Sequence, residues 1–197
     1  APLRPSSALA SADRSEDNPG DAGVSHARLR GVAIHALLQR LPDAPPLMRG
    51  AVAKAQIAAR WPALADESET ILRDVLAIID HPDLASLFGA NALSETAIAA
   101  DLPRAGRKPV RIMGQIDRLA ETRDGIVIAD YKTGALREGK PAAAHVAQLA
   151  LYREALRRIR PGKRVTGILV YTDGPVVLPL TDDILDQAAA RALDSAA

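Results

Sequence analysis

The chain has no cysteine, and only 3% of its 197 residues are aromatic. Without cysteine there is no disulfide framework, thiolate metal site, cysteine-ligated iron–sulfur cluster or cysteine nucleophile. Long apolar runs are missing too, since none reaches the ~20 residues that a membrane-spanning helix needs. Because aromatic residues are so few, the hydrophobic 48% of the chain must build its core mainly from Ala, Leu, Ile and Val.

A strong excess of charge is also lacking, because the formal net charge is only +1. This value does not exclude nucleic acid, which needs no more than a local basic patch. We expect most of the basic residues to lie on solvated faces and some to contact phosphates. Two basic groups stand out: Arg104, Arg107, Lys108 and Arg111, and then Arg153, Arg157, Arg158, Arg160, Lys163 and Arg164.

The first residues show neither the basic start nor the apolar core of a signal peptide, and there is no initiator Met. We therefore expect a piece of a longer protein. Residues 1–24 are rich in Ser, Ala, Asp, Pro and Gly without an apolar period, which predicts a linker or a disordered tail. Residues 25–197 are predicted to form one domain.

The first half of this domain has helical periodicity. The pattern predicts a helix from Ser25, as its cap, to Leu41, where Pro42 stops it. Further helices are predicted over residues 47–60 and 66–80, and a short helical turn over residues 81–89.

The second half is different, because its apolar residues alternate as in strands. Strands are predicted from about Glu95 to Leu102 and over residues 109–121, 126–132, 164–172 and 175–180. A long helix is predicted over residues 142–160, and a short helix from Asp182 closes the chain. This order predicts an α/β (α+β) fold, with a mixed central sheet flanked by helices and an N-terminal helical layer.

One apolar strand, "GIVIADYKTG" at residues 125–134, ends in opposite charges. Alternation puts Asp130 and Lys132 on one face, and in the preceding strand it groups Asp117 with Leu119 and other odd-numbered residues. The hairpin between the strands can bring Asp117 opposite Asp130. Two close carboxylates repel unless a cation lies between them, and a hard divalent cation such as Mg²⁺ suits their oxygens. The alternative is a surface salt bridge between Asp130 and Lys132.

Four ordered motifs resemble the RecB-type branch of the PD-(D/E)XK nucleases. They are "GVAIH" at 31–35, "GQIDRLAE" at 114–121, "IVIADYKTG" at 126–134 and "QLALYREAL" at 148–156. This resemblance covers roughly residues 25–195. The stretches "HALLQRLPD", "LFGANALSETAI", "GQIDRL" and "YREALRRIRPGKRVTGILVYTDGP" are similar to the C-terminal nuclease domain of alphaproteobacterial AddA-type helicase–nuclease proteins. The resemblance implies a restriction-endonuclease-like core. Gln115 departs from the pattern, because a second basic residue often stands there.

This resemblance implies a metal site that holds Mg²⁺, or Mn²⁺ in its place. Asp117, Asp130, His35 and the backbone carbonyl of Tyr131 would be the ligands, and Lys132 would orient or activate the attacking water. A histidine beside an apolar helix stripe can also be an ordinary core residue, so that alternative stays open for His35.

Three further residues are implied to support the site. Gln148 and Tyr152 lie one helical turn apart on one face and would steady the site or the DNA strand. Glu95 matches an acidic position before the first core motif, and both a supporting and a purely structural role stay open for it.

The function implied by the resemblance is a metal-dependent deoxyribonuclease domain. It would act as an exonuclease within a bacterial, cytoplasmic helicase–nuclease for double-strand break repair and recombination. Its partners would be DNA, as single strands from a helicase, and an AddB-type protein; no membrane and no iron–sulfur cluster is expected. Two alternatives are a non-catalytic DNA- or partner-binding module with a nuclease fold, and a stand-alone nuclease of the same superfamily.

Overall fold

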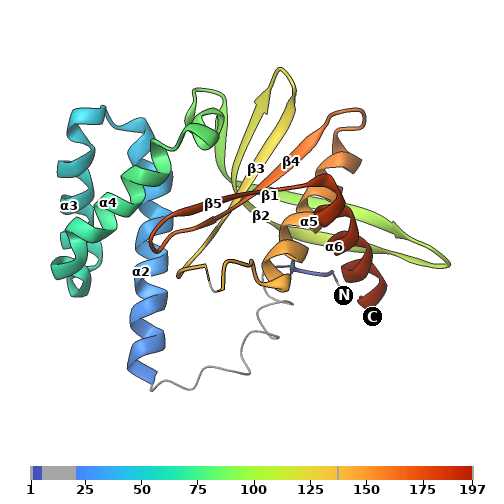
Figure 1. Cartoon of the computed structure of the whole chain (residues 1–197), viewed down its shortest axis with the longest axis horizontal. Coiled ribbons are helices and arrows are strands. Elements are labelled where there is room, and N and C mark those ends of the chain that lie inside the picture. Colours follow the sequence, from blue (N-terminus) through green and yellow to red (C-terminus); the bar gives the residue numbers. More distant parts are fainter. Residues whose placement is uncertain (1, 6–20, 137, 197) are drawn as a thin grey trace.

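The computed structural model describes residues 2–5, 21–136 and 138–196, in which a group of helices precedes a sheet (Figure 1). None of the helices in these ranges is both long and apolar enough to cross a membrane. The helices are α2 (Asp21–Arg40), α3 (Arg49–Arg60), α4 (Ser68–Ile79), α5 (Ala143–Ile159) and α6 (Asp182–Ser195), with a 3-10 helix η5 (Pro82–Phe88). The strands are β1 (Ala92–Arg104), β2 (Arg107–Thr122), β3 (Gly125–Lys132), β4 (Val165–Tyr171) and β5 (Val176–Leu180).

The sheet has five strands in the order β1-β2-β3-β4-β5. Neighbouring strands are antiparallel except β3 and β4, which are parallel and are joined through α5. A parallel connection needs such a crossover, because a short turn can only reverse the chain direction. A mixed sheet flanked by helices confirms the predicted fold class.

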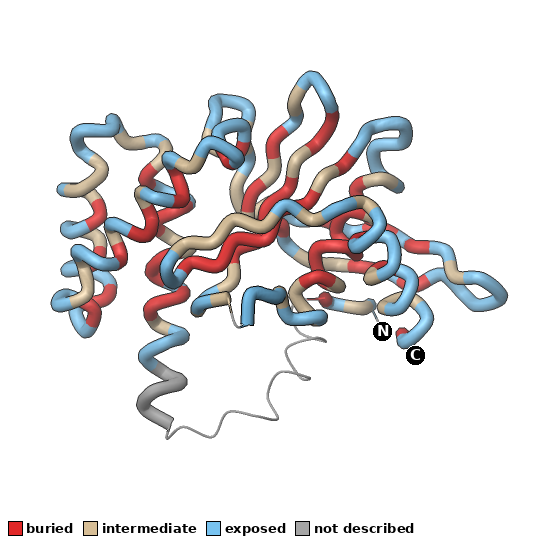
Figure 2. The backbone as a smooth tube through the Cα atoms, viewed as in Figure 1, coloured by how far each residue is buried: buried red, intermediate tan, exposed pale blue. Residues whose placement is uncertain are grey.

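Each face of the sheet has its own hydrophobic core. Helices α2, α3 and α4 pack with η5 on one face, and α5 and α6 cover the other (Figure 1). Strand β3 lies between both cores: Ile126 and Ile128 pack towards α5, whereas Ala129 and Tyr131 pack towards α2. Its apolar run is therefore buried on both sides, as the buried central strands of Figure 2 show.

The N-terminal boundary differs from the prediction. Helix α2 begins at Asp21, so Ser25 lies inside the helix and does not cap it. The predicted linker or tail falls mostly on residues 6–20, which lie outside the described residues. Leu3 forms a β-bridge: its N–H donates to the Arg111 carbonyl (2.8 Å), and its carbonyl accepts from the N–H of Met113 (3.1 Å). Such a contact with a distant strand cannot be read from local composition.

The predicted alternation of β2 is wrong at one point. Ile116 and Leu119 pack into the same core, although residues three apart point to opposite faces of a regular strand. The direction of the side chains therefore shifts between them, next to Asp117. On the neighbouring strand, Glu95 has a left-handed backbone conformation with φ 51°, which is uncommon for a residue other than glycine. Both irregularities lie at the same level of the sheet.

Candidate metal and catalytic site

Carboxylates from neighbouring strands meet at this irregular level. The flanking pairs of β1 and β2, Ser94–Arg118 and Thr96–Ile116, place Glu95 opposite Asp117. Glu95 itself has no partner in the regular pairing of the two strands. Its backbone carbonyl accepts a hydrogen bond from Gln115 Nε2 (3.1 Å). The left-handed backbone conformation thus accompanies a local break in the ladder. Strain of this kind often marks a functional site.

Strands β2 and β3 separate at Asp117. Their regular ladder ends at the Arg118–Ala129 pair, one step before Asp117 would face Asp130. In place of the next ladder bond, the N–H of Tyr131 donates to Asp117 Oδ2 (2.6 Å). The side chain of Asp117 is thereby held in the opening between the two strands.

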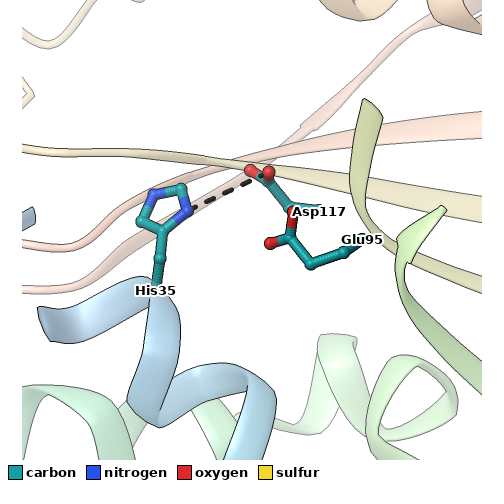
Figure 3. A group of neighbouring side chains, drawn as sticks. All are labelled: His35, Glu95 and Asp117. Atoms are coloured by element: carbon teal, nitrogen blue, oxygen red, sulfur yellow. Dashed lines mark ion pairs between the residues drawn. The ribbon is translucent and has the colours of Figure 1, made fainter. Parts of the chain in front are cut away.

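Three potential metal ligands converge in this opening. His35, Glu95 and Asp117 each offer an atom, and all three atoms lie within 4.8 Å of one another (Figure 3). His35 comes from α2, and its Nδ1 is 4.0 Å from Asp117 Oδ1. The imidazole packs edge-on against the ring of Tyr131, with 5.6 Å between ring centroids and an interplanar angle of 88°. That contact fixes the ring beside the carboxylates.

Burial changes the protonation equilibria of this group. Burial first, and then the negative charge of Asp130, raise the pKa of Asp117 to about 8, although the Tyr131 N–H and the Lys132 ammonium oppose the rise. Burial also raises the pKa of Glu95 and lowers that of His35. Neutral imidazole is the form that binds metal, whereas the carboxylates need a nearby positive charge to ionise.

Asp130 and Lys132 form a second group beside the first. Asp130 is only 2% exposed, and its Oδ2 lies 2.6 Å from Lys132 Nζ in an ion pair. Lys132 Nζ also donates to Gln148 Oε1 (2.5 Å), and Gln148 Nε2 donates to the hydroxyl of Tyr152 (3.4 Å). Gln148 and Tyr152 therefore hold the lysine from α5. The ion pair is largely buried, which differs from the surface salt bridge weighed as an alternative.

Two motif glycines permit close approaches around the site. A Cβ on Gly31 of α2 would collide with the side chain of Thr133, just after β3. A Cβ on Gly114 of β2 would collide with the ring of Tyr152, 2.5 Å from Cε1 and 2.7 Å from Cζ. These glycines allow α2 and α5 to approach the sheet and to carry their polar side chains to it.

The predicted residues thus fall into two adjacent sets. Glu95 lies with His35 and Asp117 in the group that could hold a metal ion, whereas the sequence suggested only a supporting or a structural role for it. Asp130 is not part of that three-residue group and faces Lys132 instead.

One residue of the second basic group is buried, although most of these residues were expected on solvated faces. Arg153 is fully buried and links α5 to α6, with ion pairs to Asp182 (2.7 Å) and Asp186 (2.6 Å). The sequence groups Arg153 with other basic residues of the same helix, and this grouping gives no sign that the side chain is buried.

Sequence reasoning also left one residue out. Arg118 follows Asp117 directly and is buried, and only its place in the "GQIDRL" motif could have drawn attention to it.

The donor atoms fit a hard divalent cation. Carboxylate oxygens with one imidazole nitrogen are suitable ligands for such an ion. Oδ2 of Asp130 is buried and accepts no hydrogen bond of acceptable geometry, even though it lies in the ion pair with Lys132. Burial and the negative charge of Asp130 raise the pKa of Asp117, and a bound cation would offset both effects. Since the chain contains no cysteine, a cysteine-ligated iron–sulfur cluster is excluded.

Two curated relatives share a name, each being the A subunit of an ATP-dependent helicase/nuclease. The relative from Bacillus velezensis is 28% identical, and the alignment covers 77% of this chain and 14% of that protein. The relative from Desulforamulus reducens is 27% identical, with coverage of 77% and 13%. The chain therefore spans about one seventh of the length of these relatives.

A solved structure and a family model complete the comparison. The crystal structure of SSO0001 overlaps with a TM-score of 0.35 at 23% identity, covering 69% of this chain and 66% of that one, which is too weak a likeness to carry an argument. The model of the PD-(D/E)XK nuclease superfamily matches residues 8–193. This match covers nearly the whole chain, and we conclude that the chain belongs to the PD-(D/E)XK nuclease superfamily.

Proposed function

We propose that this domain hydrolyses phosphodiester bonds of DNA and depends on a divalent cation, Mg²⁺ or Mn²⁺. The observation that carries the proposal is the convergence of His35, Glu95 and Asp117 within 4.8 Å, inside a member of a nuclease superfamily. Asp130 and the backbone carbonyl of Tyr131 complete the proposed ligand set, and Glu95 joins it because of its position. When bound, the cation would supply activation of water and stabilisation of negative charge.

Lys132, Gln148 and Tyr152 have separate roles in the proposed reaction. Lys132 Nζ donates a hydrogen bond to the attacking water, because one of its three donors remains beside those directed at Asp130 and Gln148, and its positive charge acts on the phosphate. Gln148 positions Lys132, and Tyr152 in turn positions Gln148. An ammonium held in this way stabilises charge on the phosphate without having to reorganise. The expected products are a 5′-phosphate and a 3′-hydroxyl.

Cleavage of a labelled single-stranded oligonucleotide tests this proposal. The isolated chain should cleave with Mg²⁺ or Mn²⁺ and not with EDTA. Lys132→Ala and Asp130→Ala should each lower the rate by about 10²-fold or more, because each removes a group that acts on developing charge. Lys54→Ala is the matched control, since Lys54 pairs with Glu69 on the surface of the helical layer.

Undiminished cleavage by both site variants would show that the site is assigned wrongly. DNA binding without cleavage by the unmodified chain would instead support the non-catalytic module.

The similarity to helicase/nuclease proteins supports a more specific setting. In this proposal the domain is the exonuclease of an alphaproteobacterial AddA-type protein, which acts in double-strand break repair and recombination in the cytoplasm. A helicase part delivers single strands to it, and an AddB-type protein is its partner. Sequencing the complete reading frame tests this, because a helicase part must precede the domain; a reading frame of domain size would indicate a stand-alone nuclease.

A further inference from the structure

Arg118 is a buried cation that lacks an anionic partner. Its side chain is on β2, and the residue is 6% exposed. Nε donates to the Leu87 carbonyl (2.8 Å), and the guanidinium stacks on the ring of Phe88, 4.9 Å from its centroid. Among the described residues, no carboxylate pairs with it, and its terminal amino groups donate no other hydrogen bond. The terminal amino groups are not among the buried polar atoms that lack a partner, so they reach the solvent, and a guanidinium without a carboxylate partner favours an anion that comes to it.

The other buried arginines show how unusual this is. Arg30 pairs with Asp74 (3.1 Å), and Arg153 pairs with two aspartates of α6. In the described part of the chain, both of these buried guanidiniums meet carboxylates, whereas Arg118 does not. A purely structural role would not require the terminal amino groups to stay unpaired. Their free donors point to a ligand that is supplied from outside.

Arg118 lines a polar pocket of about 430 Å³. The pocket adjoins the candidate metal site, because α2, β1 and β2 contribute residues to both. Gln39 lies one helical turn after His35 on α2, Ser94 precedes Glu95 on β1, and Arg118 follows Asp117 on β2. A strand whose scissile bond lies at the metal site can therefore extend directly into this pocket.

We infer that Arg118 forms a subsite for a backbone phosphate of the nucleic-acid strand, next to the cleaved position. The planar guanidinium presents its two amino groups in the geometry that suits phosphate oxygens. Stacking on Phe88 and the bond to Leu87 orient the guanidinium before the strand arrives. This inference rests on the proposed nuclease function, since it takes the strand as the ligand.

Ala90 offers a way to block this subsite without touching Arg118. Ala90 is exposed and lines the pocket. Ala90→Glu places a carboxylate where it can pair with the guanidinium, and Ala90→Gln is the matched neutral control. Arg118→Met removes the charge directly, but it also removes the bond to Leu87 and can weaken folding. Asp43→Asn removes an exposed carboxylate from the lining of the pocket and should tighten binding.

The experiment measures binding of a fluorescent single-stranded DNA in EDTA over a series of NaCl concentrations, with thermal unfolding as a folding check. Ala90→Glu and Arg118→Met should weaken binding about 10- to 100-fold, as expected for a charge-assisted contact. The slope of log affinity against log salt should become shallower by about 0.7, the value for one phosphate on a single strand. Ala90→Gln should bind nearly as the unmodified chain does.

Unchanged affinity and salt slope in folded Ala90→Glu would overturn the inference, as would an unmodified chain that does not bind the strand. A separate cleavage assay with Mn²⁺ distinguishes this result from failure of the proposed function. If the variants lose binding but the unmodified chain does not cleave, the phosphate subsite stands and the nuclease proposal fails.

Discussion

Replacing Asp117 by Asn should stabilise the protein when no divalent cation is present. Burial and the negative charge of Asp130 raise the pKa of Asp117 to about 8, from an ordinary value of 3.8. The amide has the same shape, carries no charge, and keeps an oxygen that can accept the hydrogen bond from the Tyr131 N–H. The variant thus removes the electrostatic penalty and retains the main contact.

The sign of the pH dependence follows from proton linkage. Between pH 3.8 and about 8, the folded state keeps the proton of Asp117, whereas the unfolded chain releases it. The free energy of unfolding therefore falls as pH rises through this window. One pH unit corresponds to about 1.4 kcal/mol, so the three units up to pH 7 give a ceiling of about 4 kcal/mol. Because relaxation reduces this penalty, we expect the variant to gain at least about 1 kcal/mol.

Thermal unfolding in EDTA at pH 5 to 9 measures this effect. A gain of 1 kcal/mol corresponds to about 2–4 °C in Tm for a protein of this size. The stability of the unmodified chain should fall towards pH 8, and that of Asp117→Asn should fall less. Excess Mn²⁺ should raise the Tm of the unmodified chain, because at a hundredfold excess over Kd it adds about 2.7 kcal/mol to the free energy of unfolding. The Tm of the variant should rise far less.

Asp101→Asn is the matched control for this experiment. Asp101 is on β1, and its side chain is exposed and pairs with Arg111 (3.1 Å). Exposed pairs contribute little, so this change should move stability by less than about 1 kcal/mol and should leave the Mn²⁺ effect intact. A lower Tm for Asp117→Asn than for the unmodified chain in EDTA at pH 7 to 8 would refute the reasoning. If Mn²⁺ stabilised the unmodified chain and Asp117→Asn equally, Asp117 would not be a metal ligand.

Two further predictions concern the support of the site. Gly114→Ala should lower stability by about 1–3 kcal/mol in urea unfolding, because its Cβ collides with Tyr152; Gly50→Ala, with a contact of 3.6 Å and a helical position, should be neutral or stabilising. A stable Gly114→Ala would contradict the close approach. Gln148→Leu should lower kcat by about 10-fold or more and leave KM nearly unchanged, because Lys132 loses an acceptor but the strand contacts remain. A change in KM alone would instead favour a direct contact between Gln148 and DNA.

Much of the architecture was readable from the sequence because its signals are local. The apolar run of β3 and the helical spacing in α5 predicted these elements and their order correctly. The hairpin predicted between residues 109–121 and 126–132 is present and joins β2 to β3. Asp130 and Lys132 lie two residues apart on one strand, so simple alternation was enough to place them together.

The positions of the candidate ligands depended on tertiary packing. His35 reaches the site because Gly31 lets α2 approach Thr133, a contact between residues about a hundred positions apart. Glu95 faces the same point because both strands leave regular geometry there, and an alternation rule assumes that they do not.

By itself, the sequence determined the order of the elements, the mixed α/β character of the fold and the residues capable of metal chemistry, because these follow from short-range periodicity and residue type. Only the tertiary structure decided which carboxylates converge with His35, that Arg153 is paired inside the protein, and that Arg118 is buried without an anionic partner among the described residues. Burial and charge pairing depend on what other segments bring near a side chain. No local pattern in the chain encodes that environment.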